Sequence, residues 1–570
     1  MHAVTWADWL TIIAYLGIVT WIGLHAARKV KTSSDFFISD RKFGKLFMIF
    51  LGFGSGSHAD QAVSVAAKTY RVGASGIWYQ WLWLFVTPFY WVMPTFIRRM
   101  RIVTMADYFE IRYDRGVSVL YAMVGILQLA VSIGLMLRGS AVMISAISGG
   151  QIDPGLAIAG MTVLFVVYGV AGGLSAAIIT DLLQGILTIV LSFLIIPFAL
   201  ARVGGMSGLR DAVGNPAMFQ IVAGEEITVF FIAVVSFNAL IGWITQPTAT
   251  LAGAGKTEME SRVGVAGGGL MKRVCTVAWT LTGLCAVAMY AGKDIDVDHV
   301  FGLMAHDLLP TIAPGLLGLF IASMLASIMS SCDAFMVLSS GLFVENIYRP
   351  FLAKGRPDRH YVLAGRVASI AVVAGALVFA YTMQSVVTGL EVFWKVAAMM
   401  GVAAWLGIFW RGATVAGAWA GTLAGLFVWL FTERIAAGPF VWDFNATLAG
   451  HLPEFMLWEG NLHLPWQMIF YLSTGFVVSV AVSLFTKKVD PRRLDRFYAC
   501  MRTPITPDEP ETAAGTLPEG VEPAPRRVLF DHPDFEIPVP TRTSVVGFVV
   551  LWILVGLFIY TGIWIFSLGQ

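Results

Sequence analysis

The chain has 570 residues, of which 57% are hydrophobic and only 13% are charged. A soluble globular protein is nearer ~45–50% apolar and ~25% charged, so the composition excludes a soluble multidomain protein and indicates a polytopic membrane protein embedded in a lipid bilayer. The net charge is only +2, which leaves no basic field to collect nucleic acid, and we expect ions or small molecules as partners.

Apolar runs long enough to cross a bilayer recur along the whole sequence, because a spanning helix needs about 20 apolar residues. Scanning for such runs predicts fourteen spans, an all-α integral membrane protein. The predicted spans are residues 7–27, 46–67, 75–97, 117–147, 155–177, 181–203, 227–250, 272–292, 312–345, 362–384, 390–410, 413–433, 466–487 and 544–567.

Lys and Arg collect in the short loops that follow odd-numbered spans, for example in residues 28–45 and 98–115. The loops between them are acidic or neutral, as in residues 293–298. Loops rich in Lys and Arg stay in the cytoplasm. The distribution therefore predicts that odd-numbered loops are cytoplasmic and that both termini lie outside, in a multi-pass protein of the plasma (inner) membrane.

Residues 488–543 change in composition to Pro, Glu, Thr and Arg and have no apolar period. Such a segment is expected to be a cytoplasmic linker of low order that tethers the last helix without adding a catalytic domain. We accordingly divide the chain into an extra N-terminal helix with its cytoplasmic loop, a transport core with one following helix, an outer loop with the penultimate helix, the linker and the C-terminal helix. These parts are residues 1–45, 46–433, 434–487, 488–543 and 544–570.

Two predicted spans contain helix-breaking residues at matching places. The second holds Leu51-Gly-Phe-Gly-Ser-Gly-Ser57, and the seventh holds Gly242-Trp-Ile-Thr-Gln-Pro247. If spans 2–6 and 7–11 form two five-helix units, the breaks correspond, and matched breaks indicate a transporter built from inverted repeats whose unwound carbonyls can hold a cation. The alternative is that the glycines only let helices pack closely.

Ser327, Ser330 and Ser331 are spaced i, i+3 and i+4, which places three hydroxyls on one helical face. A hard cation such as Na⁺ prefers oxygen ligands, so this face is a candidate ion site. The alternative is that the serines pack between helices or bond to carbonyls of their own helix.

Among the charged residues within or at the ends of spans, we single out four as candidates: Asp60, Asp181, Asp333 and Arg138. Intramembrane carboxylates are costly and mark ion or proton pathways by default. Asp181 has an alternative role as an acid at a helix N-terminus. Arg138 could clamp a solute carboxylate, or it could pair with a neighbouring acid.

Several motifs are similar to those of the sodium/solute symporters, and most closely to the sodium–sugar cotransporter branch. The segment Tyr168-Gly-Val-Ala-Gly-Gly-Leu-Ser-Ala-Ala-Ile-Ile-Thr-Asp-Leu-Leu-Gln184 resembles the family signature YGxxGGLxAxxxTDxxQ at every fixed position. Further matches are Asp35-Phe-Phe with Arg41, Ala326–Asp333 ahead of Asn346-Ile-Tyr348, and Leu406–Arg411 with Gly417-Ala418.

This resemblance implies a LeuT-type fold with a 5+5 inverted-repeat core and Na⁺ as the coupling ion. It also implies a sodium site between the broken second helix and the ninth. Its ligands would be the carbonyls of Gly54, Ser57 and Ser327 and the hydroxyls of Ser330 and Ser331. Some relatives bind a second sodium near the acid that corresponds to Asp181, with serines where this chain has Asp333 and Ala334.

The same resemblance places Gln61, Gln80, Asn238 and Lys272 on residues that contact sugar in the family. Amide and ammonium groups in a dry site suit a neutral polyol, because each unpaired polar group there would cost ~1–3 kcal/mol. The chain departs from the branch at two positions. Ile241 replaces a tyrosine that forms the inner gate in the branch, and Trp83 replaces a serine.

The expected function is therefore sodium-coupled symport of a small polar organic solute by alternating access, with a sugar as the favoured solute. The alternatives are a sodium symporter for an amino acid, carboxylate or other metabolite, with Arg138 as the anion clamp, and a solute sensor that does not transport. The sequence contains no HExxH, GxSxG or His-rich span, so we do not expect an enzyme, and the matched breaks argue against a channel.

Overall fold

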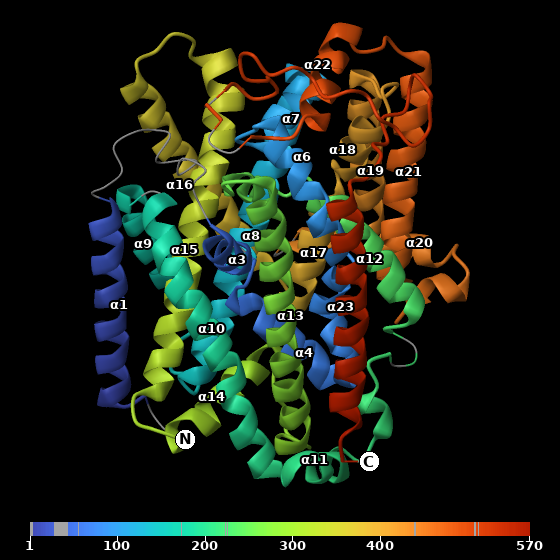
Figure 1. Cartoon of the computed structure of the whole chain (residues 1–570). Helices are drawn as coiled ribbons and strands as arrows, with labels where there is room; N and C mark the ends of the chain where they lie inside the picture. The colour runs from blue at the N-terminus through green and yellow to red at the C-terminus, as the bar shows by residue number, and fades with distance from the viewer. Residues whose placement is uncertain are drawn as a thin grey trace.

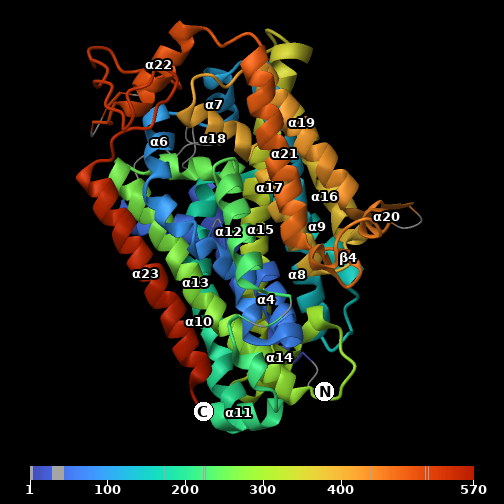
Figure 2. The ribbon, with the colours of Figure 1, turned by 90° about the vertical axis from the view of Figure 1, so that its right-hand side faces the viewer.

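The computed structural model describes residues 4–27, 44–54, 56–172, 174–222, 224, 226–437, 440–506, 509–510 and 512–569. The long helices are α1 (Trp6–Ala27), α8 (Arg115–Ile147), α9 (Pro154–Gly172), α10 (Leu174–Val203), α13 (Glu258–Met289), α15 (Leu316–Phe343), α16 (Asp358–Thr382), α19 (Val415–Thr432), α21 (Leu464–Phe485) and α23 (Arg542–Ser567). They run side by side and enclose shorter helices (Figures 1 and 2).

The shorter α-helices connect or interrupt the long ones. They are α3 (Lys45–Gly54), α4 (Ala59–Val72), α5 (Trp78–Trp81), α6 (Met93–Met100), α7 (Met105–Arg112), α11 (Gly205–Val213), α12 (Val229–Trp243), α14 (Val300–Leu308), α17 (Val386–Ala398), α18 (Gly401–Phe409), α20 (Asn445–Ala449) and α22 (Pro491–Arg502).

Tighter and wider helical turns and two small hairpins complete the fold. The 3₁₀-helices are η2 (Gly73–Ile77), η3 (Leu82–Leu84), η4 (Thr87–Trp91), η5 (Pro216–Phe219), η6 (Pro247–Ala254), η7 (Val297–His299), η8 (Leu309–Thr311) and η10 (Glu454–Met456), and η9 (Val344–Leu352) is a π-helix. The strands pair antiparallel, β1 (Arg434–Ala437) with β2 (Phe440–Asp443) and β3 (Leu457–Trp458) with β4 (Asn461–Leu462).

The fourteen predicted spans each coincide with one helix or with consecutive helices. In the described part of the chain, eight helices are long and apolar enough to cross a membrane, or nine if α12 and η6 count as one bent span. The remaining intervals are divided by breaks, such as the one between α3 and α4, or reach beyond the described side chains. The number of spans therefore stays a prediction.

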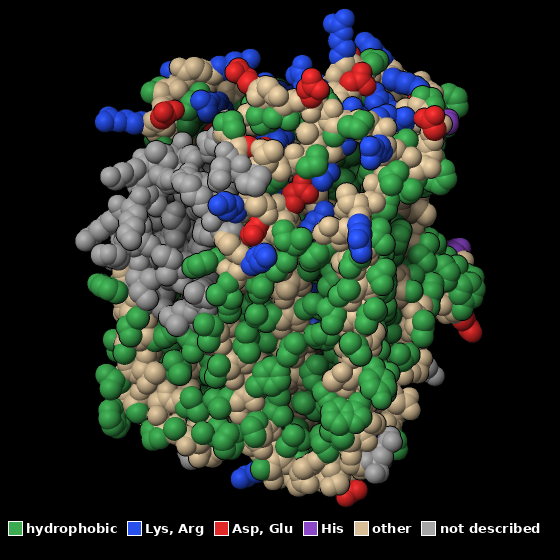
Figure 3. All heavy atoms as spheres, in the orientation of Figure 1, with side chains coloured by type: hydrophobic (Ala, Val, Ile, Leu, Met, Phe, Trp, Pro, Cys, Tyr) green, Lys and Arg blue, Asp and Glu red, His purple; other side chains and the backbone are tan. Residues whose placement is uncertain are grey.

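The two termini lie at the same end of the molecule (Figure 1). Lys and Arg side chains gather at the opposite end, above a broad belt of hydrophobic side chains (Figure 3). The shared side of the termini agrees with the predicted topology. We expect the termini to face outward because the opposite end is rich in Lys and Arg, which is typical of the cytoplasmic side.

The linker between α21 and α23 differs from the sequence expectation. Residues 491–541, which we call the strap, begin with α22 and fold across the Lys- and Arg-rich end (Figures 1 and 2). Glu509 accepts from Nε and Nη2 of Arg101 at 3.0 and 2.8 Å, and Glu536 accepts from Arg411 at 2.9 Å. The expectation of low order is therefore wrong: charge pairs and backbone bonds order this segment in place of apolar periodicity.

Candidate functional site

The first helix break separates α3 from α4. Gly56 N–H donates to the Phe53 carbonyl at 3.3 Å, and Ser57 N–H donates to the Gly54 carbonyl at 3.4 Å. These short-range turn bonds replace the regular helical ladder, and His58 continues in extended backbone (φ −127°, ψ 164°) before α4 begins. The glycine-rich stretch thus interrupts the helix, as its sequence predicts.

The same stretch also contains a close helix–helix contact. A Cβ on Gly52 would lie 2.8 Å from the Gly264 carbonyl oxygen, and a Cβ on Gly268 would lie 2.6 Å from the Gly52 carbonyl carbon. Only glycine lets α3 and α13 approach this closely. Both interpretations of the glycine run hold, each at its own residues: Gly52 serves packing, and Gly54 and Gly56 lie at the break.

The second break lies between α12 and η6, whose axes differ by 64°. The Thr245 hydroxyl donates to the carbonyls of Gly242 and Ala397, at 3.0 and 2.9 Å, so it fixes the end of α12 against α17. Gln246 follows in extended backbone and precedes Pro247. A proline at the start of η6 lacks the N–H that a continuing helix would need, which explains the interruption.

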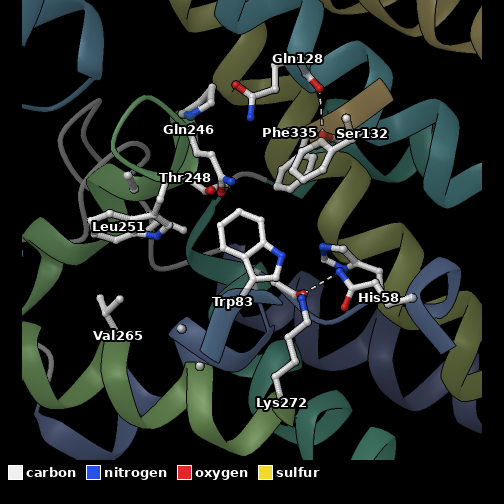
Figure 4. A pocket seen from close by; sticks show the side chains of 18 of the residues that line it. His58, Trp83, Gln128, Ser132, Gln246, Thr248, Leu251, Val265, Lys272 and Phe335 are labelled. Atoms are coloured by element: carbon white, nitrogen blue, oxygen red, sulfur yellow. Dashed lines mark hydrogen bonds between the residues drawn. The ribbon is translucent and has the colours of Figure 1, made fainter. Parts of the chain in front are cut away.

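A cavity of about 160 Å³ lies between the two breaks (Figure 4). Trp83 lies between Gln246 and Thr248 on one side and His58 and Lys272 on the other. The lining of the cavity combines amide, charged and aromatic side chains from α4, α5, α8, α12, α13, α15 and α17 and from η3 and η4. The polar members include His58, Asp60, Gln61, Gln80, Gln128, Gln246, Lys272 and Arg273, and the aromatic ones include Trp83, Tyr90, Trp243, Phe335, Phe393 and Trp394.

Three of the four expected solute residues reach this cavity: Gln61, Gln80 and Lys272. The Gln61 amide nitrogen donates to the Gly56 carbonyl at 2.8 Å, and the Lys272 ammonium donates to the same carbonyl. Arg273 Nη1 donates to the side-chain oxygen of Gln80 at 3.2 Å. The carbonyl exposed by the break therefore gathers two donors beside the cavity.

Asn238 does not belong to this lining. Its amide nitrogen donates to the Trp394 carbonyl at 3.1 Å, and its amide oxygen accepts from the Tyr471 hydroxyl of α21. The side chain is fully buried. Asn238 thus lies on the face of α12 that packs against α17 and α21, where both ends of its amide bond to protein.

The residues expected to hold sodium lie at the first break and on α15. The hydroxyl of Ser331 and Nδ1 of His58 share a hydrogen bond of 3.2 Å, which brings the start of α4 against α15. Ser57 is buried, and its hydroxyl has no hydrogen-bond partner among the described residues. The side chains of Ser327 and Ser330 lie outside the described residues. The Gly54 and Ser57 backbone and the Ser331 hydroxyl are therefore the described parts of the expected set.

Two of the remaining charged candidates, Asp333 and Arg138, do not line the cavity. The Asp181 side chain lies outside the described residues. Asp333 is buried on α15, and its Oδ1 has no hydrogen-bond partner among the described residues. Arg138 acts electrostatically on Asp296 at the terminal end, where the hydrogen bond from His299 and the charge of Arg138 lower the pKa of the Asp296 carboxyl group. Arg138 Nε has no hydrogen-bond partner among the described residues, so both roles of Arg138, anion clamp and partner of an acid, stay predictions.

Six polar lining residues were not among the predicted site residues: His58, Gln128, Ser132, Gln246, Thr248 and Arg273. Two of them stand in stretches that sequence analysis singled out, because Gln246 lies inside the second break and His58 directly follows the first. Arg273 is the neighbour of Lys272, and Gln128 is a polar residue in an apolar span. Polar side chains within spans were thus the available signal.

Comparison with known proteins gives one family match. A family model described as SSF: Sodium:solute symporter family matches residues 36–425. The chain is 25% identical to the high-affinity proline transporter PutP of Bacillus subtilis, over 65% of this chain and 80% of that protein. It is 21% identical to the sodium/glucose cotransporter of Vibrio parahaemolyticus, over 65% of this chain and 74% of that protein.

Two solved structures share the fold. A Na⁺-coupled sialic acid symporter, in a substrate-bound outward-open state, superposes with a TM-score of 0.68 at 17% identity, over 85% of this chain and 99% of that one. Mhp1, a nucleobase-cation-symport-1 family transporter, superposes with a TM-score of 0.51 at 10% identity, over 82% and 99% of the two chains. The chain therefore has the LeuT-type fold of these symporters.

Proposed function

Because the chain belongs to the sodium:solute symporter family, we propose that it carries a small neutral polyhydroxylated solute, a sugar, into the cell together with Na⁺. The named relatives are transporters, so the expectation that the chain is not an enzyme is confirmed. Na⁺ is the coupling ion of the family. We place the protein in the plasma (inner) membrane, where a sodium gradient can drive uptake.

The cavity between the two breaks is the observation that carries the sugar proposal. Four glutamine side chains line it: Gln61, Gln80, Gln128 and Gln246. Aromatic rings, among them Trp83, line it as well. A sugar offers hydroxyls that both donate to and accept from amides, and it offers apolar ring faces that pack on aromatic side chains.

The position of the cavity supports alternating access. Its lining includes α3, η6 and the first half of α13, which lie toward the Lys- and Arg-rich end. On the side of the termini, the Lys68 ammonium pairs with Glu226, and the Tyr79 hydroxyl donates to Glu391 at 2.6 Å. These contacts tie α4 and α5 to the loop before α12 and to α17. The conformation suits a state that releases solute to the cytoplasm.

For the ion we propose the site between the first break and α15. Its ligands are the carbonyls of Gly54, Ser57 and Ser327 and the hydroxyls of Ser330 and Ser331. The 3.2 Å bond between Ser331 and His58 supports this placement, because it sets the α15 hydroxyl next to the unwound backbone. Oxygen ligands of this kind suit Na⁺. Asp181 and Asp333 stay candidates for a second ion or for coupling.

A second candidate solute is an amino acid such as proline. The cavity holds Asp60 as well as Lys272 and Arg273, and opposite charges could receive the two ends of a zwitterion. The similarity to PutP of Bacillus subtilis also favours this alternative.

Uptake into proteoliposomes tests the proposal. Labelled D-glucose, D-galactose and L-proline are offered with an inward Na⁺ gradient and with choline in place of Na⁺. We expect Na⁺-dependent accumulation of at least one sugar and none of L-proline. If only L-proline accumulates, the solute is an amino acid and the sugar proposal is wrong. Binding of a solute without uptake in any gradient would identify a sensor.

A further inference from the structure

Four polar atoms of side chains that line the cavity have no hydrogen-bond partner among the described residues. They are two acceptors, Oδ1 of Asp60 and Oε1 of Gln61, and two donors, Nε of Arg273 and Nε1 of Trp394. Each of the four residues is more than nine-tenths buried. Leaving such groups unpaired is costly, so these atoms mark where a bound solute would supply the missing partners.

The orientation of the Gln61 amide determines which partner it needs. Its nitrogen donates to the Gly56 carbonyl at 2.8 Å, so its oxygen is the end that faces the cavity unpaired. The Lys272 ammonium also donates to the Gly56 carbonyl. One donor of each of these two side chains is therefore used within the chain, whereas the unpaired oxygen of Gln61 can only accept.

Asp60 adds a second acceptor in the same turn of α4. Its carboxylate interacts electrostatically with Lys272, but its Oδ1 has no hydrogen-bond partner among the described residues. In the ionised form, which the charge of Lys272 favours, this carboxylate accepts hydrogen bonds and cannot donate them. Two neighbouring acceptors thus lie at the start of α4, directly after the first break, and Arg273 Nε is a donor in the same cavity.

We infer that Asp60 and Gln61 together form an acceptor pair that selects a solute by its donor groups, and that Asp60 is a specificity-determining residue. Under the proposed function, on which this inference rests, the donors are hydroxyls of the sugar. A solute carboxylate can only accept, so it is disfavoured at this pair and would bind toward the cationic side chains of Lys272 and Arg273. If the solute is instead an amino acid, the shared chemistry is the N–H donor of its ammonium group.

The experiment pairs a protein change with a solute change. Asp60→Asn keeps the size of the side chain and replaces one acceptor by a donor. Wild-type and Asp60→Asn protein, both full length, are titrated calorimetrically in saturating Na⁺ with the sugar that binds wild type, D-glucose or D-galactose, and with each of its monodeoxy derivatives. We expect Asp60→Asn to weaken binding of the parent sugar about tenfold.

The decisive result is a coupling to one hydroxyl. One monodeoxy sugar should bind wild type about tenfold more weakly than its parent sugar does. Asp60→Asn should weaken binding of this derivative little further, because the hydroxyl that contacts Asp60 is already missing. Equal loss for the parent sugar and all its deoxy derivatives would overturn the inference. Na⁺ titration without solute shows whether the variant is folded.

Asp333→Asn is the comparison variant. This variant makes the same change at another buried carboxylate whose Oδ1 lacks a hydrogen-bond partner among the described residues. Unlike Asp60, Asp333 does not line the cavity. Any loss of solute affinity should be the same for every sugar derivative. Coupling of Asp333→Asn to one hydroxyl, as strong as that of Asp60→Asn, would contradict the assignment to Asp60.

A protein that binds L-proline and no sugar would refute the proposed solute class while still testing the acceptor pair. The analogue then is N,N-dimethyl-L-proline, which has no N–H donor. The inference holds if Asp60→Asn weakens L-proline much more than the dimethyl analogue. It fails if both lose the same factor.

Discussion

His58 is the residue at which the ion site and the solute cavity meet. Its ring lines the cavity between the breaks, and it also borders a second small cavity beside Ser57. Nδ1 bonds to the Ser331 hydroxyl, and the ring packs edge-on against Phe335 at 6.0 Å between centroids. A side chain in this position can orient the hydroxyl that we assign to Na⁺.

This contact yields the first prediction. Ser331→Ala should raise the Na⁺ concentration for half-maximal binding about tenfold, since one oxygen ligand is lost. His58→Leu should have a smaller effect of the same sign, because the hydroxyl loses its orientation, and the double variant should cost no more than Ser331→Ala alone. Calorimetric Na⁺ titration without solute measures both.

Ser339→Ala and His58→Asn make the controls for that titration. Ser339 is buried on the same helix, and its hydroxyl bonds to the Met336 carbonyl, so its loss should leave Na⁺ affinity unchanged. His58→Asn keeps a group that can bond Ser331 and should restore part of the affinity. Full additivity of His58→Leu and Ser331→Ala would show that the two residues act separately.

The residues of the site were only partly predictable from sequence. Motif resemblance led to Gln61 and Lys272. Local spacing fixes the position of Gln61 beside the first break, whereas Lys272 reaches the Gly56 carbonyl by a contact across 216 positions of the chain. It failed to anticipate the surroundings of Asn238, since the bond from Tyr471 depends on how α21 packs. Trp83, noted as a departure from the sugar branch, lines the cavity with its ring.

At the scale of helices, the contact between α3 and α13 depends on glycine at facing positions. α13 is anchored at its first turn, where the Glu260 carboxylate accepts from the Thr257 N–H at 3.1 Å and the Thr257 hydroxyl accepts from Met259. Such a capping box fixes where the helix begins. Gly264 and Gly268, both well inside α13, then meet Met48 and Gly52 of α3.

Gly268→Ala should therefore destabilise the protein. The added Cβ would lie 2.6 Å from backbone atoms of both Gly52 and Phe53, which cannot give way as a flexible side chain could. Overpacking of this kind costs typically ~1–3 kcal/mol. The thermal midpoint of the purified protein, followed by tryptophan fluorescence, should fall.

Gly375→Ala is the matched control for that change. Gly375 lies on α16, and nothing stands within 4 Å of a Cβ there. Replacing an exposed helical glycine by alanine should leave the thermal midpoint the same or raise it. An equal midpoint for Gly268→Ala and wild type would mean that α3 moves away from α13 at little cost.

Helix breaks were the most predictable elements, because glycine and proline act locally. The stretches at 51–57 and 242–247 interrupt helices where their sequences say they should. The long run at 312–345 was ambiguous, since hydrophobicity alone cannot tell where a span ends. In the structure α15 passes into the π-helix η9, which carries the helical run on to Leu352.

For the whole molecule, the charge distribution predicts that the Lys- and Arg-rich end faces the cytoplasm, and cysteine labelling can test this orientation. Glu519→Cys lies on the exposed part of the strap, and Asp296→Cys lies exposed at the terminal end. An impermeant maleimide should modify Asp296→Cys in intact cells and Glu519→Cys only after the membrane is opened. Gly515 would be a poor probe, because it is buried with φ +67°.

The native cysteines should give little background in this experiment. All four are buried, and burial raises the pKa of the Cys500 thiol in the strap. A thiol that stays protonated reacts slowly with maleimide. The reverse labelling pattern would invert the topology, with the strap outside.

The contacts of the strap also indicate which residues stabilise the Lys- and Arg-rich end. The Glu509 carboxylate pairs with Arg101, whose side chain is only 1% exposed. Glu509→Gln would remove a buried carboxylate that pairs with Arg101 and lies 3.6 Å from Arg98, and removing one partner of a buried ion pair destabilises the fold around it. Hydrogen exchange should rise in α6 and in residues 509–517, with little change at the cavity.

Glu519→Gln serves as the control, since its side chain is exposed on the same segment. It should leave hydrogen exchange as in wild type. If Glu509→Gln also exchanges as wild type does, the strap is held by its backbone bonds alone, such as the one from Gly515 N–H to the Met100 carbonyl.

Arg101 and Glu509 are separated by 408 positions in the chain, and this separation has a consequence for biosynthesis. The ribosome delivers the arginine early, with the loop after α6, and delivers its acid only when nearly nine-tenths of the polypeptide has been made. Until then Arg101 lacks this carboxylate. The Lys- and Arg-rich end can therefore take its final structure around Arg101 only late in translation, when the residues just before the final helix emerge.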